Sequence, residues 1–375
     1  MNLSNLTLEE WLKAPPKDAF KNAGDSTPYS ANYEALKAQL NVHHNETTKA
    51  AILEGIKAQI EKAHDFQLES MIWLNDHGPK HISTVVERAS AILACGDVKL
   101  NVREVYILLA AIQFHDVGNF YGRLGHEKKI MYVMAETLPK VAFDSVETLY
   151  IKDIAKVHGG KIKGKDGKDD PNTIGTLKNT TTIDGYEIRC RLLAAILRFA
   201  DEIADDKSRS DLKLLSSGKI PKSSEVFHAY SACLDTVIVK EESKTVELHF
   251  KIPKYLLEKK LGKVDHEVYI IDEIHERALK MHTERIYCSK FWNRVIHIDN
   301  IWVQIEFYTI PQVTMGLDDE DLFVHDDITY TLHDNQYPSG PSDIYSICPD
   351  LKSREGKKFD GEYFHEKLFK VANEA

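Results

Sequence analysis

An ionisable pair at the end of a long apolar segment constrains the fold of this chain more than any other feature. In YILLAAIQFHDVGNF, His115 and Asp116 follow directly after residues whose apolar side chains recur at helical spacing. A carboxylate at an apolar surface is costly unless a partner compensates its charge. A divalent cation held jointly by imidazole and carboxylate is the simplest compensation, and Gly118 then favours the end of the helix. The segment therefore indicates a helical domain with a metal site.

The His-Asp dipeptide alone carries little information, because it occurs four times in the chain. The copies are His64-Asp65, His115-Asp116, His325-Asp326 and His333-Asp334. Only the apolar setting separates the second copy from the others.

Two further segments offer polar side chains on predicted helices. In HGPKHISTVVERA, Pro79 occupies a favoured first helical position and His81 begins an amphipathic run. In RLLAAILRFADEIADD, Asp201 shares a broad face with Leu193 and Leu197. Imidazole and carboxylate ligands without thiolate suit Mn, Fe, Zn, Ni or Mg, and the sequence does not choose among these metals.

The order of one His, then His-Asp, then a distant Asp on successive helices resembles the HD superfamily of metal-dependent phosphohydrolases. The resemblance covers roughly residues 66–211, and LRFADEIADDKSRSD is similar to the final motif of bacterial HD proteins that carry an extra α+β region. It implies that one or two divalent ions are bound, with His81, His115, Asp116 and Asp201 as metal ligands.

Additional histidines of HD proteins bind a second metal or act as a general acid. By this resemblance His126 in GRLGHEKK and His158 in AKVHGGK are candidate catalytic residues together with Asp116. The chain departs from the cyclic-di-GMP phosphodiesterase branch, because no Gly-Tyr-Pro triplet follows and His158 has no adjacent second His. The number of ions therefore stays open.

Cationic side chains close to these histidines are candidates for binding substrate phosphate. The candidates are Arg123, Lys128 and Lys129. Four lysines of the loop after His158 are more typical of a solvated loop: Lys161, Lys163, Lys165 and Lys168. His77, one turn before His81, is more typical of a helix cap or a supporting group than of a ligand.

The periodicity of apolar residues divides the chain into four predicted parts. Residues 1–60 are expected to be an N-terminal extension, 61–220 the HD phosphohydrolase domain, 221–312 an α+β domain and 313–375 a C-terminal extension. In the α+β part, the alternation in DTVIVKEESKTVELHFKIP predicts two strands, and a helix is expected over about 268–281. The fold class is therefore mainly α, an HD-type helical bundle with a smaller C-terminal α+β domain.

Composition narrows the class of protein further. The 375 residues carry a formal net charge of -10, which argues against wholesale binding of duplex nucleic acid. Five cysteines without a C-x-x-C pair suggest neither a disulfide framework nor a thiolate zinc site, and no membrane span or signal peptide is recognised. We expect a cytoplasmic protein.

The resemblance favours hydrolysis of a nucleotide or related phosphate ester by metal-activated water, with a histidine protonating the leaving oxygen. Deoxynucleoside triphosphates, cyclic nucleotides and nucleoside monophosphates all stay open as substrates. The alternatives are a single-strand nuclease, or a non-catalytic nucleotide-sensing or partner-binding module whose α+β domain mediates assembly, for example into a homo-oligomer. By analogy, this domain combination would suit bacterial signalling or antiviral defence.

Overall fold

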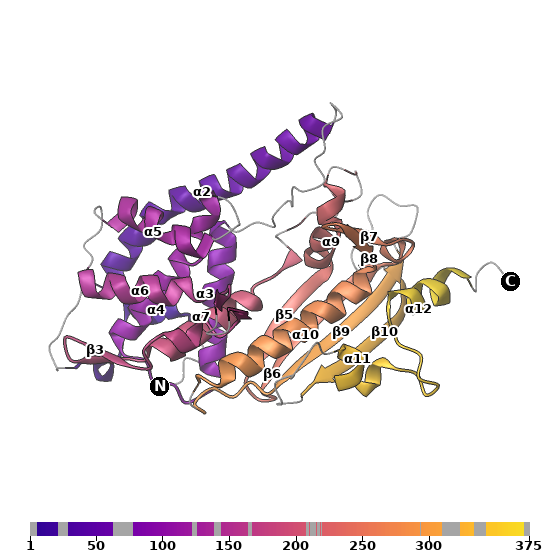
Figure 1. The fold of residues 1–375 in the computed structure, drawn as a ribbon. Coiled ribbons are helices and arrows are strands. Elements are labelled where there is room, and N and C mark those ends of the chain that lie inside the picture. Colours follow the sequence, from indigo (N-terminus) through magenta and orange to yellow (C-terminus); the bar gives the residue numbers. More distant parts are fainter. Residues whose placement is uncertain are drawn as a thin grey trace. The chain divides into compact units, whose positions relative to one another are not determined.

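The computed structural model describes most of the chain in thirteen stretches. They comprise residues 6–21, 29–62, 78–121, 126–138, 144–163, 167–207, 210, 215, 218, 220–292, 294–309, 323–333 and 343–370. The chain forms two compact units (Figure 1). Unit 1 contains Met1–Ala50, His77–Ala204 and Tyr287–Ile298, and unit 2 contains Ala51–Asp76, Asp205–Ile286 and Asp299–Ala375.

Unit 1 is built mainly from helices. They are α1 (Leu8–Lys13), the first part of α2 (Tyr29–Lys62), α3 (Pro79–Ala94), α4 (Val102–Phe114), α5 (His126–Thr137), α6 (Ser145–Lys156) and α7 (Cys190–Glu202). The mainly α class expected from the sequence is confirmed.

Helix α4 forms the centre of unit 1, because all of its residues are buried. A capping box starts it: the Asn101 side chain accepts hydrogen bonds from the backbone N–H groups of Arg103 and Glu104, and Glu104 accepts one from the Asn101 N–H in return. The apolar residues that follow have no polar face to expose, so the helix is stable only when other helices cover it on every side.

The described N-terminal residues also belong to this core. Leu8, Trp11, Leu36 and Leu40 are all buried. The backbone N–H of Leu8 also donates to Ser90 Oγ of α3 at 2.9 Å. Helix α1 has a single buried stripe of apolar residues, and the surface that covers this stripe exists only in the folded chain. The sequence alone therefore does not show that α1 is part of the core.

The loop predicted after His158 contains no regular helix longer than one turn in its described part. It forms two small antiparallel hairpins, of β1 (Ile162–Lys163) with β2 (Asp169–Asp170) and of β3 (Thr181–Ile183) with β4 (Tyr186–Ile188).

Unit 2 contains a four-stranded mixed sheet with the order β10-β9-β6-β5. Its strands are β5 (Leu234–Lys240), β6 (Thr245–Pro253), β9 (Asn300–Thr309) and β10 (Phe323–Leu332). β6 runs parallel to β9, and the two outer pairs are antiparallel. As the alternating pattern predicts, Val237, Val246, Leu248 and Phe250 are buried.

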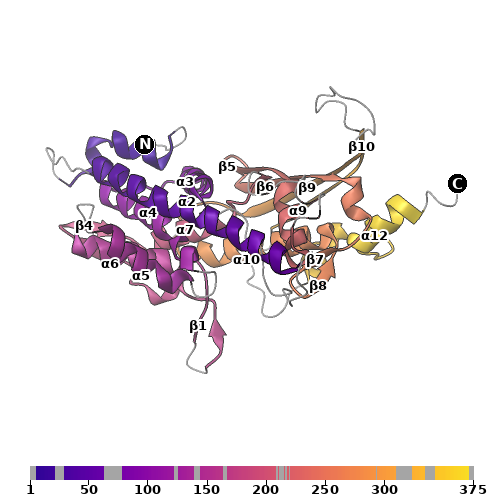
Figure 2. The same ribbon diagram turned by 90° about the horizontal axis from the view of Figure 1, so that it is seen from above.

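Helix α10 (Ile270–Ser289) covers one face of this sheet, as both views show (Figures 1 and 2). Its apolar stripe of Ile270, Ile271, Ile274 and Ala278 is buried, as predicted. The unit also contains α9 (Glu225–Cys233), the hairpin of β7 (Leu261–Lys263) with β8 (His266–Val268), α11 (Ile344–Ile347) and α12 (Gly361–His365).

The described residues after β9 belong to unit 2. Strand β10 completes the sheet with buried Ile328, Tyr330 and Leu332. The acidic residues Asp326 and Asp327, which come just before these positions, make the strand hard to recognise in the sequence. Helix α12 is followed by a π-helical turn, Glu366–Lys370.

Candidate metal centre

His81 lies in the first turn of α3 and is buried. Gly78 precedes this helix in an extended conformation, and Pro79 occupies a first-turn position, as the sequence predicts. Because α3 begins only two residues before His81, the imidazole lies at the N-terminal end of this helix. Its Nε2 atom is 3.2 Å from Asp201 Oδ1 and 3.7 Å from Asp116 Oδ2.

His115 and Asp116 follow the last residue of α4, and both are buried. The Nδ1 of His115 lies 2.7 Å from the carbonyl oxygen of Ile112, so Nδ1 carries the proton and donates. This leaves Nε2 facing the carboxylates, at 3.5 Å from Asp116 Oδ2 and 3.4 Å from Asp201 Oδ1.

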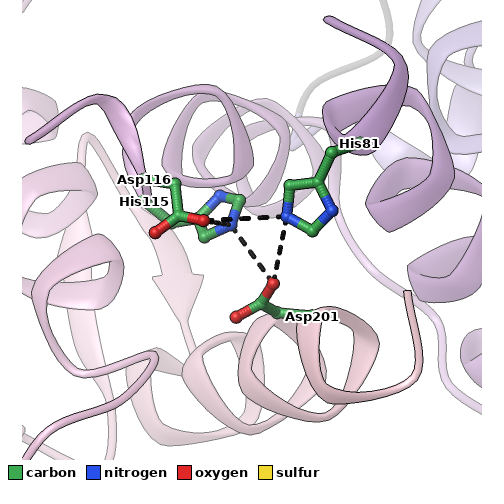
Figure 3. Close-up of side chains that lie close together, drawn as sticks. All are labelled: His81, His115, Asp116 and Asp201. Atoms are coloured by element: carbon green, nitrogen blue, oxygen red, sulfur yellow. Dashed lines mark ion pairs between the residues drawn. The ribbon is translucent and has the colours of Figure 1, made fainter. Parts of the chain in front are cut away.

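Asp201 lies in the last turn of α7, a helix whose Leu193, Leu197 and Phe199 are fully buried. Its side chain is 24% exposed, whereas those of His81, His115 and Asp116 are at most 3% exposed. Figure 3 shows the four side chains pointing toward one another from three helices. One ligand atom from each lies within 4.8 Å of the others, so the group could hold a metal ion.

A second group uses the other oxygen of Asp116. His126 Nε2 is 3.1 Å and His158 Nε2 is 3.7 Å from Asp116 Oδ1, and the two histidine Nε2 atoms are 3.2 Å apart. His158 donates from Nδ1 to the carbonyl of Ala155 at 2.6 Å, which again turns Nε2 toward the carboxylate. These three residues form a second cluster that could hold a metal ion.

The electrostatics of the two groups differ. Burial disfavours the charged form of His115, but the charges of Asp116 and Asp201 outweigh it and raise the pKa of His115 to about 9. Burial also opposes ionisation of Asp201, yet His115 and His81 hold the pKa of this carboxyl well below its usual value. Burial and the neighbouring His115 lower the pKa of His158 to about 4. The first group thus stabilises positive charge between its carboxylates, while His158 is a neutral imidazole.

The predicted phosphate-binding residues lie close to His126 in the sequence. Lys128 is exposed and Lys129 is half-buried, both on α5, while Arg123 lies outside the described residues, as do Lys165 and His77. Lys161 and Lys168 are exposed in the first hairpin.

Two residues near the centre were missed by the sequence reasoning. Glu127 Oε2 is 3.4 Å from His126 Nδ1. His44 of α2 is buried and interacts electrostatically with His115 and Asp116. The segment NVHHNE contains no pattern that separates His44 from an exposed neighbour.

The metal-ligand groups found among the described residues draw only on unit 1. Among the described residues, no helix has the length and apolar character that crossing a membrane requires.

Comparison with known proteins adds the family. No curated protein and no solved structure matches the chain. A family model described as HD-CE matches residues 68–277, which are 210 of the 375 residues and include all six clustered side chains. The chain therefore contains an HD-type domain and belongs to the HD-CE family.

Proposed function

We propose that the chain is a metal-dependent phosphohydrolase that acts on a nucleotide or a related phosphate ester. The observation that carries the proposal is the position of Asp116 between two ligand groups. Its Oδ2 atom faces His81 and His115, and its Oδ1 atom faces His126 and His158. A carboxylate shared in this way suits two ions held side by side, an arrangement used to hydrolyse phosphate esters.

The donor set fits divalent cations. Each group combines imidazole nitrogen with carboxylate oxygen, a mixture typical of Mn, Fe, Zn or Ni sites. His115 and His158 are oriented by backbone carbonyls that accept their Nδ1–H, as is usual for metal-binding histidines. The same residues without cations would bury two carboxylates among imidazoles, which is costly unless protons or cations compensate the charge.

A bound divalent cation lowers the pKa of a coordinated water and stabilises negative charge on phosphoryl oxygens. The residues of the chain supply the remaining functions. His158, whose pKa burial and His115 lower to about 4, is suited to stay neutral and not to donate a proton at neutral pH. The His126 side chain is 12% exposed, against 5% for His158, so it is the better placed of the two to exchange a proton with a leaving oxygen.

Lys128 and Lys129 support the choice of a phosphate ester as substrate. They lie two and three residues after His126 on α5, where their ammonium groups can contact phosphate oxygens next to the centre. A single-strand nuclease would use the same centre on a longer phosphodiester, and a sensing module would bind the nucleotide without cleaving it. One assay separates these three activities.

The assay combines metal analysis with phosphate release. Purified protein is analysed for bound metal and then tested with Mn, Mg, Ni and Co on deoxynucleoside triphosphates, cyclic nucleotides, nucleoside monophosphates and single-stranded DNA. We expect metal in the wild type and release from one nucleotide class. We expect Asp116→Asn to lose both, with an activity loss beyond the roughly 10- to 100-fold typical of removing a group that only orients a ligand.

The control is Asp350→Asn, at an exposed position of unit 2. It makes the same chemical change and should leave metal content and rate unchanged, and circular dichroism should show the same helical content in all three proteins. A wild-type protein without divalent metal, or a fully active Asp116→Asn variant, would show that the proposal is wrong. Nucleotide binding without turnover would identify the sensing module instead.

A further inference from the structure

A buried chain of polar side chains lies behind the last turn of α4. Gln113 Nε2 donates to the Tyr33 hydroxyl at 2.9 Å, and that hydroxyl donates to Glu9 Oε1 at 2.6 Å. Lys37 Nζ closes the outer end of the chain with bonds of 2.7 and 3.0 Å to the two Glu9 oxygens. At the inner end, the Gln113 side chain hydrogen-bonds the ring of His44.

This series of hydrogen-bonded side chains joins helices α1 and α2 to the turn that carries the proposed ligands. Glu9 comes from α1, whereas Tyr33 and His44 come from α2, and each of Tyr33, His44 and Gln113 is at most 3% exposed. Gln113 precedes His115 by two residues, in the turn whose Ile112 carbonyl orients the His115 ring. A buried amide side chain keeps its orientation only when both its oxygen and its nitrogen are hydrogen-bonded. The hydrogen-bonded side chains therefore hold the last turn of α4 in place.

The chemistry of His44 suits a position next to a cationic centre. Burial, and then the neighbouring His115, lower the pKa of His44 to about 4, so the ring is neutral at physiological pH. A neutral imidazole donates to Gln113 without adding a positive charge that would repel a divalent cation. It is not part of either ligand group, so any role at the centre passes through its neighbours.

We propose that His44 is a positioning residue of the metal centre, because with Gln113, Tyr33 and Glu9 it anchors the last turn of α4 and so orients His115 and Asp116. This inference rests on the proposed function. His44, Tyr33 and Glu9 precede the residues matched by the HD-CE model, which begin at 68. Helices α1 and α2 thus belong to the site and not only to the core.

The test measures metal affinity and stability separately. Mn²⁺ dissociation constants are determined by calorimetric titration of the folded protein, and melting temperatures are determined without metal. His44→Leu removes the hydrogen bond, His44→Gln can keep it, and Tyr33→Phe removes one hydroxyl from the chain. His43→Leu is the matched control, because it replaces the preceding histidine by the same residue.

We expect His44→Leu to weaken Mn²⁺ binding by roughly 10- to 100-fold, the range seen when groups that orient metal ligands are removed. Tyr33→Phe should weaken binding in the same direction, while His44→Gln and His43→Leu should stay close to the wild type. Lower melting temperatures with unchanged dissociation constants in His44→Leu and Tyr33→Phe would overturn the proposal and leave the proposed function standing. Absence of Mn²⁺ binding in the wild type would instead overturn the metal centre itself. If His44→Leu does not fold, Tyr33→Phe decides alone.

Discussion

Asp116 is the residue on which the chemistry of this protein converges. Its two oxygens face different groups of histidines, and it is only 3% exposed. A buried carboxylate needs compensating positive charge, which protons on the histidines or divalent cations can supply. The competition between these two sources makes the metal affinity dependent on pH.

The apparent affinity for a divalent cation should rise with pH between 6 and 8. The carboxylates of Asp116 and Asp201 outweigh burial and raise the pKa of His115 to about 9 in the metal-free protein, so the ring is protonated throughout this range. Binding must release that proton, which costs up to about tenfold in affinity for each pH unit below the pKa. Competitive titration with a chelator at pH 6, 7 and 8 measures the slope. An affinity independent of pH would contradict a role for the His115 Nε2 atom as a ligand.

The role of His126 can be separated into ligand and proton donor. As a proton donor, His126→Ala should lower turnover by roughly 100- to 10,000-fold while metal occupancy stays constant. As a ligand, the same variant should lose metal in step with activity. Metal analysis alongside kinetics distinguishes the two, and His266→Ala, at an exposed position, is the control. A rate unchanged in His126→Ala would exclude both roles.

At the scale of elements, the clustered side chains lie at or near the ends of helices. His81 is in the first turn of α3, His126 is the first residue of α5, and Asp201 is in the last turn of α7. His115 and His158 follow the ends of α4 and α6. Helix ends allow side chains from several elements to converge without bringing the helix backbones too close together. The turns that connect these ends are therefore under tight geometric constraint.

Gly118, in the turn between α4 and α5, shows this constraint. A Cβ atom at position 118 would lie 1.9 Å from the carbonyl oxygen of His126, so Gly118→Ala must push the start of α5 away. We expect loss of the second ligand group, with fewer ions bound per chain and a destabilisation on the order of 1–3 kcal/mol. Gly159→Ala is the control, because no atom of the described residues comes within 4 Å of its added Cβ.

Metal stoichiometry and thermal unfolding of both glycine variants provide the measurement. The first group of ligands does not contain His126, so one ion should remain in Gly118→Ala. Full occupancy of both groups in Gly118→Ala would contradict the constraint.

At the scale of the whole molecule, unit 1 is discontinuous in sequence. Residues Tyr287–Ile298 belong to it, although they follow most of unit 2 along the chain. Trp292 is buried and packs edge-on against Phe199, with the two ring centroids 5.7 Å apart. Phe199 lies on α7, two residues before Asp201. The Tyr287 hydroxyl accepts from the Ile174 N–H at 3.0 Å. A late segment thus supports the helix that carries a proposed ligand.

A chain cut near Pro221 should therefore not retain an intact metal centre. The fragment lacks Trp292 and Tyr287, and exposing the buried Phe199 surface costs on the order of 3 kcal/mol or more. We expect weaker metal binding and a broadened thermal transition in fragment 1–220. Trp292→Ala in the full chain should weaken binding in the same direction, with Trp302→Ala, on the sheet of unit 2, as the control. A fragment that binds metal as tightly as the full chain would contradict this account.

The parts of this protein that depend on a local pattern of residues can be predicted from the sequence alone. The periodicity of apolar residues predicts α4. The ionisable residues His115 and Asp116 at its end are recognisable because a charge at an apolar surface is costly without a compensating partner. The alternation of Val237, Val246 and Leu248 defined two strands in the same way, since side-chain direction follows the period of the backbone. The ligand candidates on α3, after α4 and on α7 could therefore be predicted from the sequence, and the structure brings them together.

Contacts between segments far apart in the sequence determine which isolated polar or interrupted segments join the core. His43 and His44 are adjacent histidines on α2, but only His44 is fully buried, and this burial makes it part of the site. Strand β10 contains two adjacent acids, Asp326 and Asp327, before its buried residues, and it becomes a strand because β9 offers it a hydrogen-bonding edge. The return of Tyr287–Ile298 to unit 1 depends on contacts with residues about 100 positions earlier, which no local period encodes.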